Sequence, residues 1–234
     1  MAALQPAGKR LLSWNLFHGR SLPPSRRELL VEFAGKLNEW QWDVALLQEV
    51  PPWWPAALAR ATASHAVSVP TSRNSLPALR RAIARRHPEL LKANGGGCNA
   101  ILARIPIQTH RAVGLRSWPE RRVAQLARLR DGTCLVNYHA STRQARAEQE
   151  LRRLAEQALG WAEGERLILG GDLNLPRPRI ADDRLIHLAG SHVDHLFARG
   201  FQLDSPPVQP DARVARDGRS LLLSDHAPLL VSLS

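Results

Sequence analysis

RLILGGDLN, at residues 166–174, says most about the fold of this chain. The apolar run is typical of a strand buried on both faces, and Asp172 and Asn174 then place a carboxylate and an amide at its end. The two residues are two positions apart, so their side chains share one face wherever the backbone is extended. The stretch predicts a buried strand that ends in polar chemistry, although an Asx-rich turn explains it equally well on its own.

Four more apolar runs end in polar clusters. These clusters are Ser13-Trp14-Asn15, Leu47-Gln48-Glu49, Asn137-Tyr138-His139 and Ser224-Asp225-His226. Because the strands of a buried sheet end at its rim, we expect the clusters to gather there. Carboxylates and amides suit a hard cation such as Mg²⁺ or Mn²⁺, and imidazoles can stabilise an oxyanion. Five independent turns are less probable than one site.

Helical and strand patterns alternate in two halves of the chain. Amphipathic spacing predicts helices over residues 25–40, 76–86 and 143–159, with Ser25 as the N-cap of the first. Apolar runs predict strands between them, and Asp131-Gly132 marks a hairpin. This is an α/β pattern, and it predicts a four-layer sandwich of two mixed, mainly antiparallel sheets flanked by helices. The length of 234 residues fits one domain over residues 1–234.

The formal net charge of +11, from 32 basic and 21 acidic residues, favours a polyanionic partner, with nucleic acid first. A compositional bias would explain why nearly all basic residues are arginine, but not why basic residues outnumber acidic ones. No run approaches the roughly 18 apolar residues of a membrane span. Without an export signal, we expect a cytoplasmic protein whose Cys98 and Cys134 are reduced and buried.

Two further features leave alternatives open. In the helix predicted over residues 76–86, leucines and Ile83 form an apolar side while Arg81 and Arg85 project opposite. These arginines could track a phosphate backbone or line a solvated face. Trp53 and Trp54 could stack on bases or on a lipid-like group, but packing of a helix onto the sheet is favoured.

In this order the clusters resemble the motifs of the endonuclease/exonuclease/phosphatase superfamily, the deoxyribonuclease I-like hydrolases. The resemblance runs from residue 10 to residue 232, and it includes the segment 192–197 and a central strand over residues 98–106. It implies an αββα sandwich and a Mg²⁺- or Mn²⁺-dependent hydrolase in which water attacks a phosphoester in line.

The resemblance also implies roles for individual residues. The cation would lie among Asn15, Glu49 and Asp225. Asp172 would activate the water, Asn174 would orient water or phosphate, and His226, partnered by Asp194, would donate to the developing charge. Three further residues would contact the phosphate or the substrate, namely His139, Asn99 and Arg122. His139 has no carboxylate on the central strand to orient it, so Asn99 or the backbone would do so.

These expectations favour a nuclease that acts on DNA or RNA, with no obligate protein partner evident. A phosphatase or phosphodiesterase for a small or lipid-linked phosphate could use the same site. A binding module without catalysis is least favoured because no ligand position has been lost. His18 and His192 lie near the motifs, and we assign them a surface or supporting role.

Overall fold

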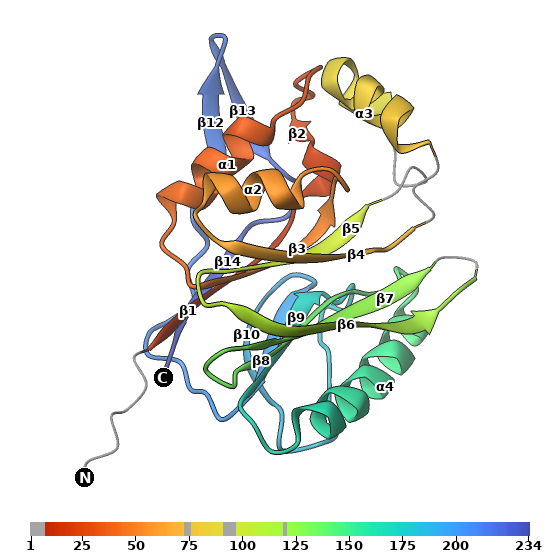
Figure 1. Ribbon diagram of the computed structural model, residues 1–234, viewed down its shortest axis with the longest axis vertical. Helices are drawn as coiled ribbons and strands as arrows, with labels where there is room; N and C mark the ends of the chain where they lie inside the picture. Colours follow the sequence, from red (N-terminus) through yellow and green to blue (C-terminus); the bar gives the residue numbers. More distant parts are fainter. Residues whose placement is uncertain (1–7, 73–75, 91–96, 119–120) are drawn as a thin grey trace.

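Two sheets packed face to face form the centre of the protein in the computed structural model, which describes residues 8–72, 76–90, 97–118 and 121–234 (Figure 1). The five-stranded sheet has, in spatial order, β14 (Leu229–Leu233), β1 (Lys9–Asn15), β3 (Val44–Val50), β5 (Cys98–Ala103) and β4 (His65–Pro70). The six-stranded sheet has, in spatial order, β10 (Ile186–Ser191), β11 (Asp194–Arg199), β9 (Leu167–Asp172), β8 (Cys134–His139), β7 (Arg122–Leu129) and β6 (Ile107–Arg116).

Helices cover the outer faces of both sheets (Figure 1). Helices α1 (Leu30–Glu39) and α2 (Pro55–Ala61) cover the five-stranded sheet, and α4 (Gln144–Ala162) covers the six-stranded sheet. The expected sandwich of two mixed sheets between helices is therefore confirmed. Among the described residues, no helix has the length and apolarity needed to cross a membrane.

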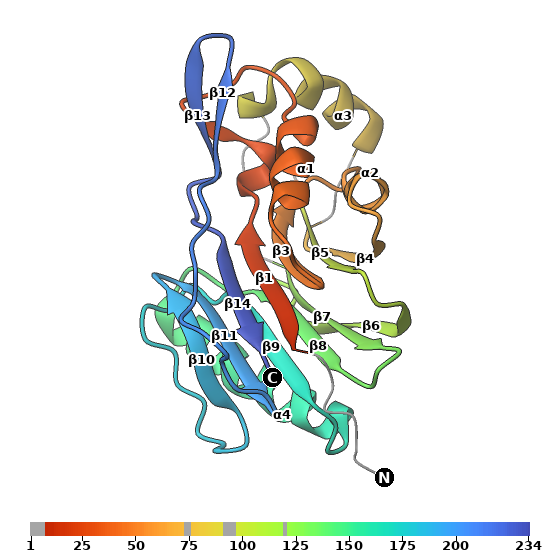
Figure 2. The same ribbon diagram turned by 90° about the vertical axis from the view of Figure 1, so that its left-hand side faces the viewer.

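Several elements lie outside the two large sheets. A small third sheet, which was not predicted, joins β12 (Arg213–Arg216), β13 (Arg219–Leu223) and β2 (Ser21–Leu22), and its hairpin projects at one end of the molecule (Figure 2). The other short elements are the 3-10 helices η1 (Phe17–Gly19) and η2 (Pro88–Leu90) and the helix α3 (Pro77–Arg86).

Three apolar cores fill the spaces between the layers. In β1, Leu11 points into the core between the sheets, while Leu12 and Trp14 point toward α1 and α2. In β3, Leu46 and Leu47 divide in the same way. Both faces of these strands are buried, which explains why the sequence shows continuous apolar runs instead of alternation.

The first helix begins later than predicted. Ser25 Oγ accepts a hydrogen bond from Arg27 N at 3.3 Å, and Arg26 adopts a left-handed φ of 60°. Ser25 thus closes a local turn instead of capping a helix, and α1 starts at Leu30.

The expectation that the tryptophans pack a helix onto the sheet is confirmed for Trp54. Its side chain is buried, and its ring centroid lies 5.3 Å from that of Phe33.

Buried amides tie the two sheets together. Asn137 Nδ2 in β8 donates to the carbonyl oxygens of Leu47 and Ala100, each at 2.9 Å, and Asn137 Oδ1 accepts from Gln48 Nε2 at 2.8 Å. Gln125 Nε2 likewise donates across the interface to Val67 O at 2.7 Å. Two residues of the polar clusters, Asn137 and Gln48, therefore fix how the sheets lie against each other.

We expect Asn137→Ala to lower the free energy of unfolding by about 3 kcal/mol, because it leaves several buried polar groups without partners. Denaturant unfolding followed by circular dichroism measures this. The matched control is Asn38→Ala, which removes one exposed hydrogen bond to Ala61 O and should cost less than about 1 kcal/mol. A loss for Asn137→Ala as small as the control's would contradict the assignment.

Candidate active site

Strand direction and register bring the polar clusters to one edge of the sandwich. β1 and β3 are parallel with Asn15 opposite Gln48, and β8 and β9 are parallel with His139 opposite Asp172. Parallel strands end at the same edge, so these residues meet there. β11 runs antiparallel to β9 and starts with Asp194 directly opposite Asp172.

Asp172 lies at the centre of this cluster and is 2% exposed. Its Oδ2 accepts a hydrogen bond from Asn15 Nδ2 at 2.9 Å, and its Oδ1 accepts one from Asn174 N at 3.0 Å. The ring nitrogens His139 Nε2 and His226 Nε2 lie 3.4 Å and 3.8 Å from Oδ2. A buried carboxylate held between an amide and two imidazoles is a strong candidate for proton transfer.

The glycines before Asp172 are required by close packing of the backbone. A Cβ on Gly171, which has a φ of 132°, would lie 2.1 Å from Tyr138 O, and one on Gly170 would lie 2.8 Å from His195 O. Neighbouring strands occupy the space that a side chain would need. The motif therefore serves the approach of β8 and β11 to β9.

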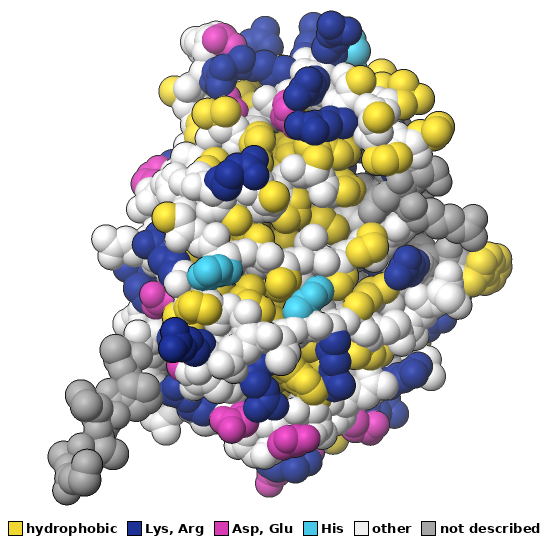
Figure 3. Space-filling model, viewed as in Figure 1, with side chains coloured by type: hydrophobic (Ala, Val, Ile, Leu, Met, Phe, Trp, Pro, Cys, Tyr) yellow, Lys and Arg dark blue, Asp and Glu magenta, His cyan; other side chains and the backbone are white. Residues whose placement is uncertain are grey.

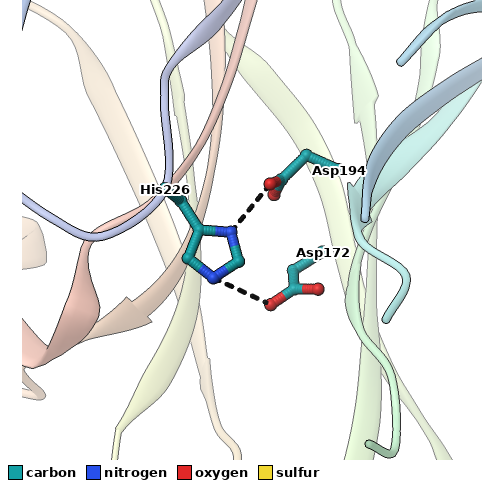
Figure 4. A group of neighbouring side chains, drawn as sticks. All are labelled: Asp172, Asp194 and His226. Carbon is teal, nitrogen blue, oxygen red and sulfur yellow. Dashed lines mark hydrogen bonds and ion pairs between the residues drawn. The ribbon is translucent and has the colours of Figure 1, made fainter. Parts of the chain in front are cut away.

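His226 lies between two carboxylates that come from β9 and β11 (Figure 4). Its Nδ1 is 2.7 Å from Asp194 Oδ2, so the expected pairing is present. Burial disfavours the protonated ring, but the hydrogen bond to Asp194 and the surrounding negative charge outweigh it and raise the pKa of His226 to about 9. Burial also raises the pKa of Asp194, to about 6. Between these values the pair is an imidazolium and a carboxylate.

Glu49, near the end of β3, contacts two histidines. His18 Nε2 is 3.0 Å from Glu49 Oε2, and His139 Nε2 is 3.8 Å from Glu49 Oε1. Burial would raise the pKa of Glu49, but the hydrogen bond and charge of His18, with the charge of His139, lower it to about 2. His18, for which a surface or supporting role was expected, thus contacts Glu49 directly. Its place three residues after Asn15 was the signal available.

His139 is buried, and burial lowers its pKa despite the negative charge of Asp172. Arg122, also buried, opposes its protonation as a nearby positive charge. Asn99 also contributes to the packing of the sheets, because its Nδ2 donates to Val123 O at 3.1 Å, which ties β5 to β7. His139 is therefore buried near the charges of Asp172 and Arg122, which act on its protonation in opposite directions.

The remaining predicted residues lie nearby. Asn174 Nδ2 donates to Ala140 O at 3.0 Å, and Asn15 Oδ1 accepts from Phe17 N at 2.9 Å. Asp225 is partly exposed, and its pKa is raised first by the partial burial of its carboxyl and also by the charge of Glu49. Glu49 and Asp225 are thus close enough to repel each other.

The donor set fits a divalent cation. Asp172, Asp194 and His226 each offer a ligand atom within 4.8 Å of the others, and Asp194 Oδ1 is buried without a hydrogen-bond partner among the described residues. Two of these three groups already bind each other, because His226 Nδ1 lies 2.7 Å from Asp194 Oδ2. Glu49 and Asp225, whose carboxylates repel each other, offer the oxygen ligands that hard cations prefer.

Comparison with known proteins supports the same kind of site. The chain matches the model of the Endonuclease/Exonuclease/phosphatase family over residues 12–226. No curated protein matches it in sequence.

Solved structures share the fold at low sequence identity. TDP2 from Caenorhabditis elegans is 15% identical, with 100% of this chain and 76% of that chain covered and a TM-score of 0.70. A Bacteroides thetaiotaomicron protein described as an endonuclease/exonuclease/phosphatase family member is 16% identical, with 98% of both chains covered and a TM-score of 0.71. A mannosyl-6-phosphatase from that bacterium is 15% identical, with 97% and 99% covered and a TM-score of 0.70.

The family match spans nearly every strand and every polar cluster that meets at the edge of the sandwich. The chain belongs to the endonuclease/exonuclease/phosphatase family, whose enzymes act on phosphoester bonds.

Proposed function

We propose that the protein is a divalent-metal-dependent phosphodiesterase that cleaves nucleic acid. The observation that supports this most is the convergence of Asp172, Glu49 and the Asp194–His226 pair at one edge of the sheets. A carboxylate for the water, a protonated donor for the phosphate and acidic cation ligands are the groups that hydrolysis of a phosphodiester requires.

Asp172 is the proposed general base. It is held in place by Asn15 and by the backbone of Asn174, so its position is fixed before the substrate arrives. We assign it the proton of the attacking water. Asn174, with Nδ2 already held at Ala140 O, is assigned to orient the water or the phosphate through its other amide hydrogen.

His226 is the proposed donor to the phosphate. Its Nδ1 proton is held by Asp194, which leaves the Nε2 proton on the side that faces Asp172. Since its pKa is raised to about 9, the ring carries both protons at neutral pH. We assign the Nε2 proton to the oxygen on which negative charge develops. His139 and Arg122 are assigned to the phosphate from the opposite side.

The proposed cation is Mg²⁺ or Mn²⁺, held by Asn15, Glu49 and Asp225. When bound, it would neutralise charge on the phosphate oxygens. The surplus of positive charge, +11 over the chain, supports a polyanionic substrate, DNA or RNA. Arg20 lies near the site, since its charge lowers the pKa of Asp225 against the larger effect of burial.

Nicking of supercoiled plasmid tests this function. We expect Mg²⁺-dependent nicking that EDTA abolishes and that Glu49→Ala lowers by about a hundredfold at fixed Mg²⁺, with partial recovery at higher Mg²⁺. The control Glu156→Ala removes an exposed carboxylate from α4 and should match the wild type. Nicking that persists in EDTA, or in Glu49→Ala at the wild-type rate, would refute the proposal.

The fold shared with a mannosyl-6-phosphatase favours a second candidate, a phosphatase or phosphodiesterase for a small or lipid-linked phosphate at the same site. A chromogenic bis-phosphodiester and a chromogenic phosphomonoester, assayed in parallel, separate the two. Turnover of these small esters without nicking of plasmid or cleavage of RNA would select the second candidate.

A further inference from the structure

Three leucines in and beside helix α3 are exposed. Of its residues, Ala84 is the one that is buried, while Leu79 is 55% exposed. Leu76 just before the helix is 68% exposed, and Leu90 just after it is 72% exposed. Short helices in proteins gain most of their stability by burying an apolar stripe, so a stripe left in solvent indicates a surface that binds something.

Basic side chains lie beside these leucines. Arg81, Arg85 and Arg86 are exposed, and α3 contains no acidic residue. By helical spacing, Leu79 lies on one side of α3 and Arg81 and Arg85 on the other, while Leu76 precedes the helix as its N-cap residue. Figure 3 shows hydrophobic and basic side chains next to one another over α3, at the upper right of that face. We call Leu76, Leu79, Leu90, Arg81, Arg85 and Arg86 the α3 surface.

The α3 surface is fixed to the body of the protein. Glu28 N donates to Arg85 O at 3.4 Å, and Arg26 N donates to Glu89 Oε1 at 2.7 Å. These bonds hold the C-terminal end of α3 and the following η2 against the segment that precedes α1. The surface therefore presents a defined arrangement to a partner.

The chain segment that contains α3 is joined at its two ends. Thr71 N, before the segment, donates a hydrogen bond to Gly97 O, after it, at 3.0 Å. A Cβ on Gly97 would lie 3.3 Å from His18 Cε1 and 3.7 Å from Glu49 Cα. The segment that carries the α3 surface is therefore anchored beside His18 and Glu49 at its C-terminal end.

We propose that the α3 surface docks the protein on an anionic lipid bilayer. A helix with an apolar side and an arginine-rich side lies in the plane of a membrane interface, with its leucines among the acyl chains and its arginines at lipid phosphates. Nucleic acid would account for the arginines but not for the leucines, because its interfaces are polar and strongly positive. The proposal goes beyond the function proposed above and does not depend on the identity of the substrate.

Sedimentation with vesicles tests the proposal. We expect the full chain to bind vesicles of phosphatidylcholine with about one third phosphatidylglycerol, and to bind pure phosphatidylcholine at least about tenfold more weakly. Leu76→Ser with Leu79→Ser should lower binding by about tenfold or more. Val31→Ser, which removes an exposed apolar side chain from α1, is the matched control and should bind as the wild type does.

The arginines have their own pair of variants. Arg81→Gln with Arg85→Gln should weaken vesicle binding about tenfold, whereas Arg152→Gln with Arg153→Gln on α4 should change it little. All variants should hydrolyse a small soluble phosphoester at the wild-type rate. Absence of vesicle binding by the wild type would overturn the proposal. So would binding of an oligonucleotide, without vesicle binding, that needs the arginines but not the leucines.

Discussion

Replacing Asp172 with asparagine is expected to lower kcat for phosphoester hydrolysis by about 10³-fold, within the range that general bases contribute. The single oxygen of the substituted amide can accept one of the two hydrogen bonds that Asp172 accepts, from Asn15 Nδ2 or from Asn174 N, so most of the local geometry should survive. What is lost is the capacity to take a proton from water. The measurement is kcat and KM for the substrate that the plasmid and chromogenic assays identify.

The control for this variant is Asp183→Asn, which changes an exposed carboxylate to an amide and touches no hydrogen bond or ion pair described for the site. Its kcat should equal that of the wild type. Circular dichroism and denaturant unfolding should confirm that Asp172→Asn is folded. If the folded variant kept more than a tenth of the wild-type kcat, Asp172 would not be the base.

His226→Gln is expected to lower kcat by about 10²- to 10³-fold, the loss typical of removing one donor to a developing oxyanion. KM should change much less, because the donor acts mainly on charge that appears during the reaction. Glutamine keeps a hydrogen-bond donor but not the positive charge, so the variant tests the imidazolium itself. If KM instead rose by as large a factor as kcat fell, His226 would also have a role in binding the substrate.

Asp194→Asn tests how His226 acquires its charge. Nuclear magnetic resonance titration in EDTA should show the pKa of His226 falling from about 9, because the variant removes the strongest interaction that raises it and leaves the opposing effect of burial. The raised pKa also stabilises the folded protein: relative to an ordinary value of 6.5, this contribution is complete below about pH 6.5 and is lost as the pH rises through about 9. An unchanged pKa in Asp194→Asn would mean that Asp194 does not hold the proton on His226.

Much of the fold was predictable because local patterns and packing agree. Continuous apolar runs such as that of β3 marked strands buried on both faces, and Asp131-Gly132 marked the β7–β8 hairpin. The β12–β13 hairpin was missed because its strands are short and partly exposed, so they lack such a run. α3 was predicted as a helix, but its spacing could not show that the apolar side would remain exposed.

Residue types and spacing within single segments were enough to indicate the chemistry, because Asp172, Asn174 and Asp225-His226 each follow an apolar run that must end at a sheet rim. The arrangement of these residues depended on contacts between distant segments. Asp194 contacts His226 across a separation of 32 positions in the sequence. Asn137, a member of one polar cluster, connects the two sheets instead of lying in the site. His18 reached Glu49 only when β1 paired with β3. Periodicity reports which face of its own strand a side chain occupies, whereas strand pairing and register set which residue lies across from it.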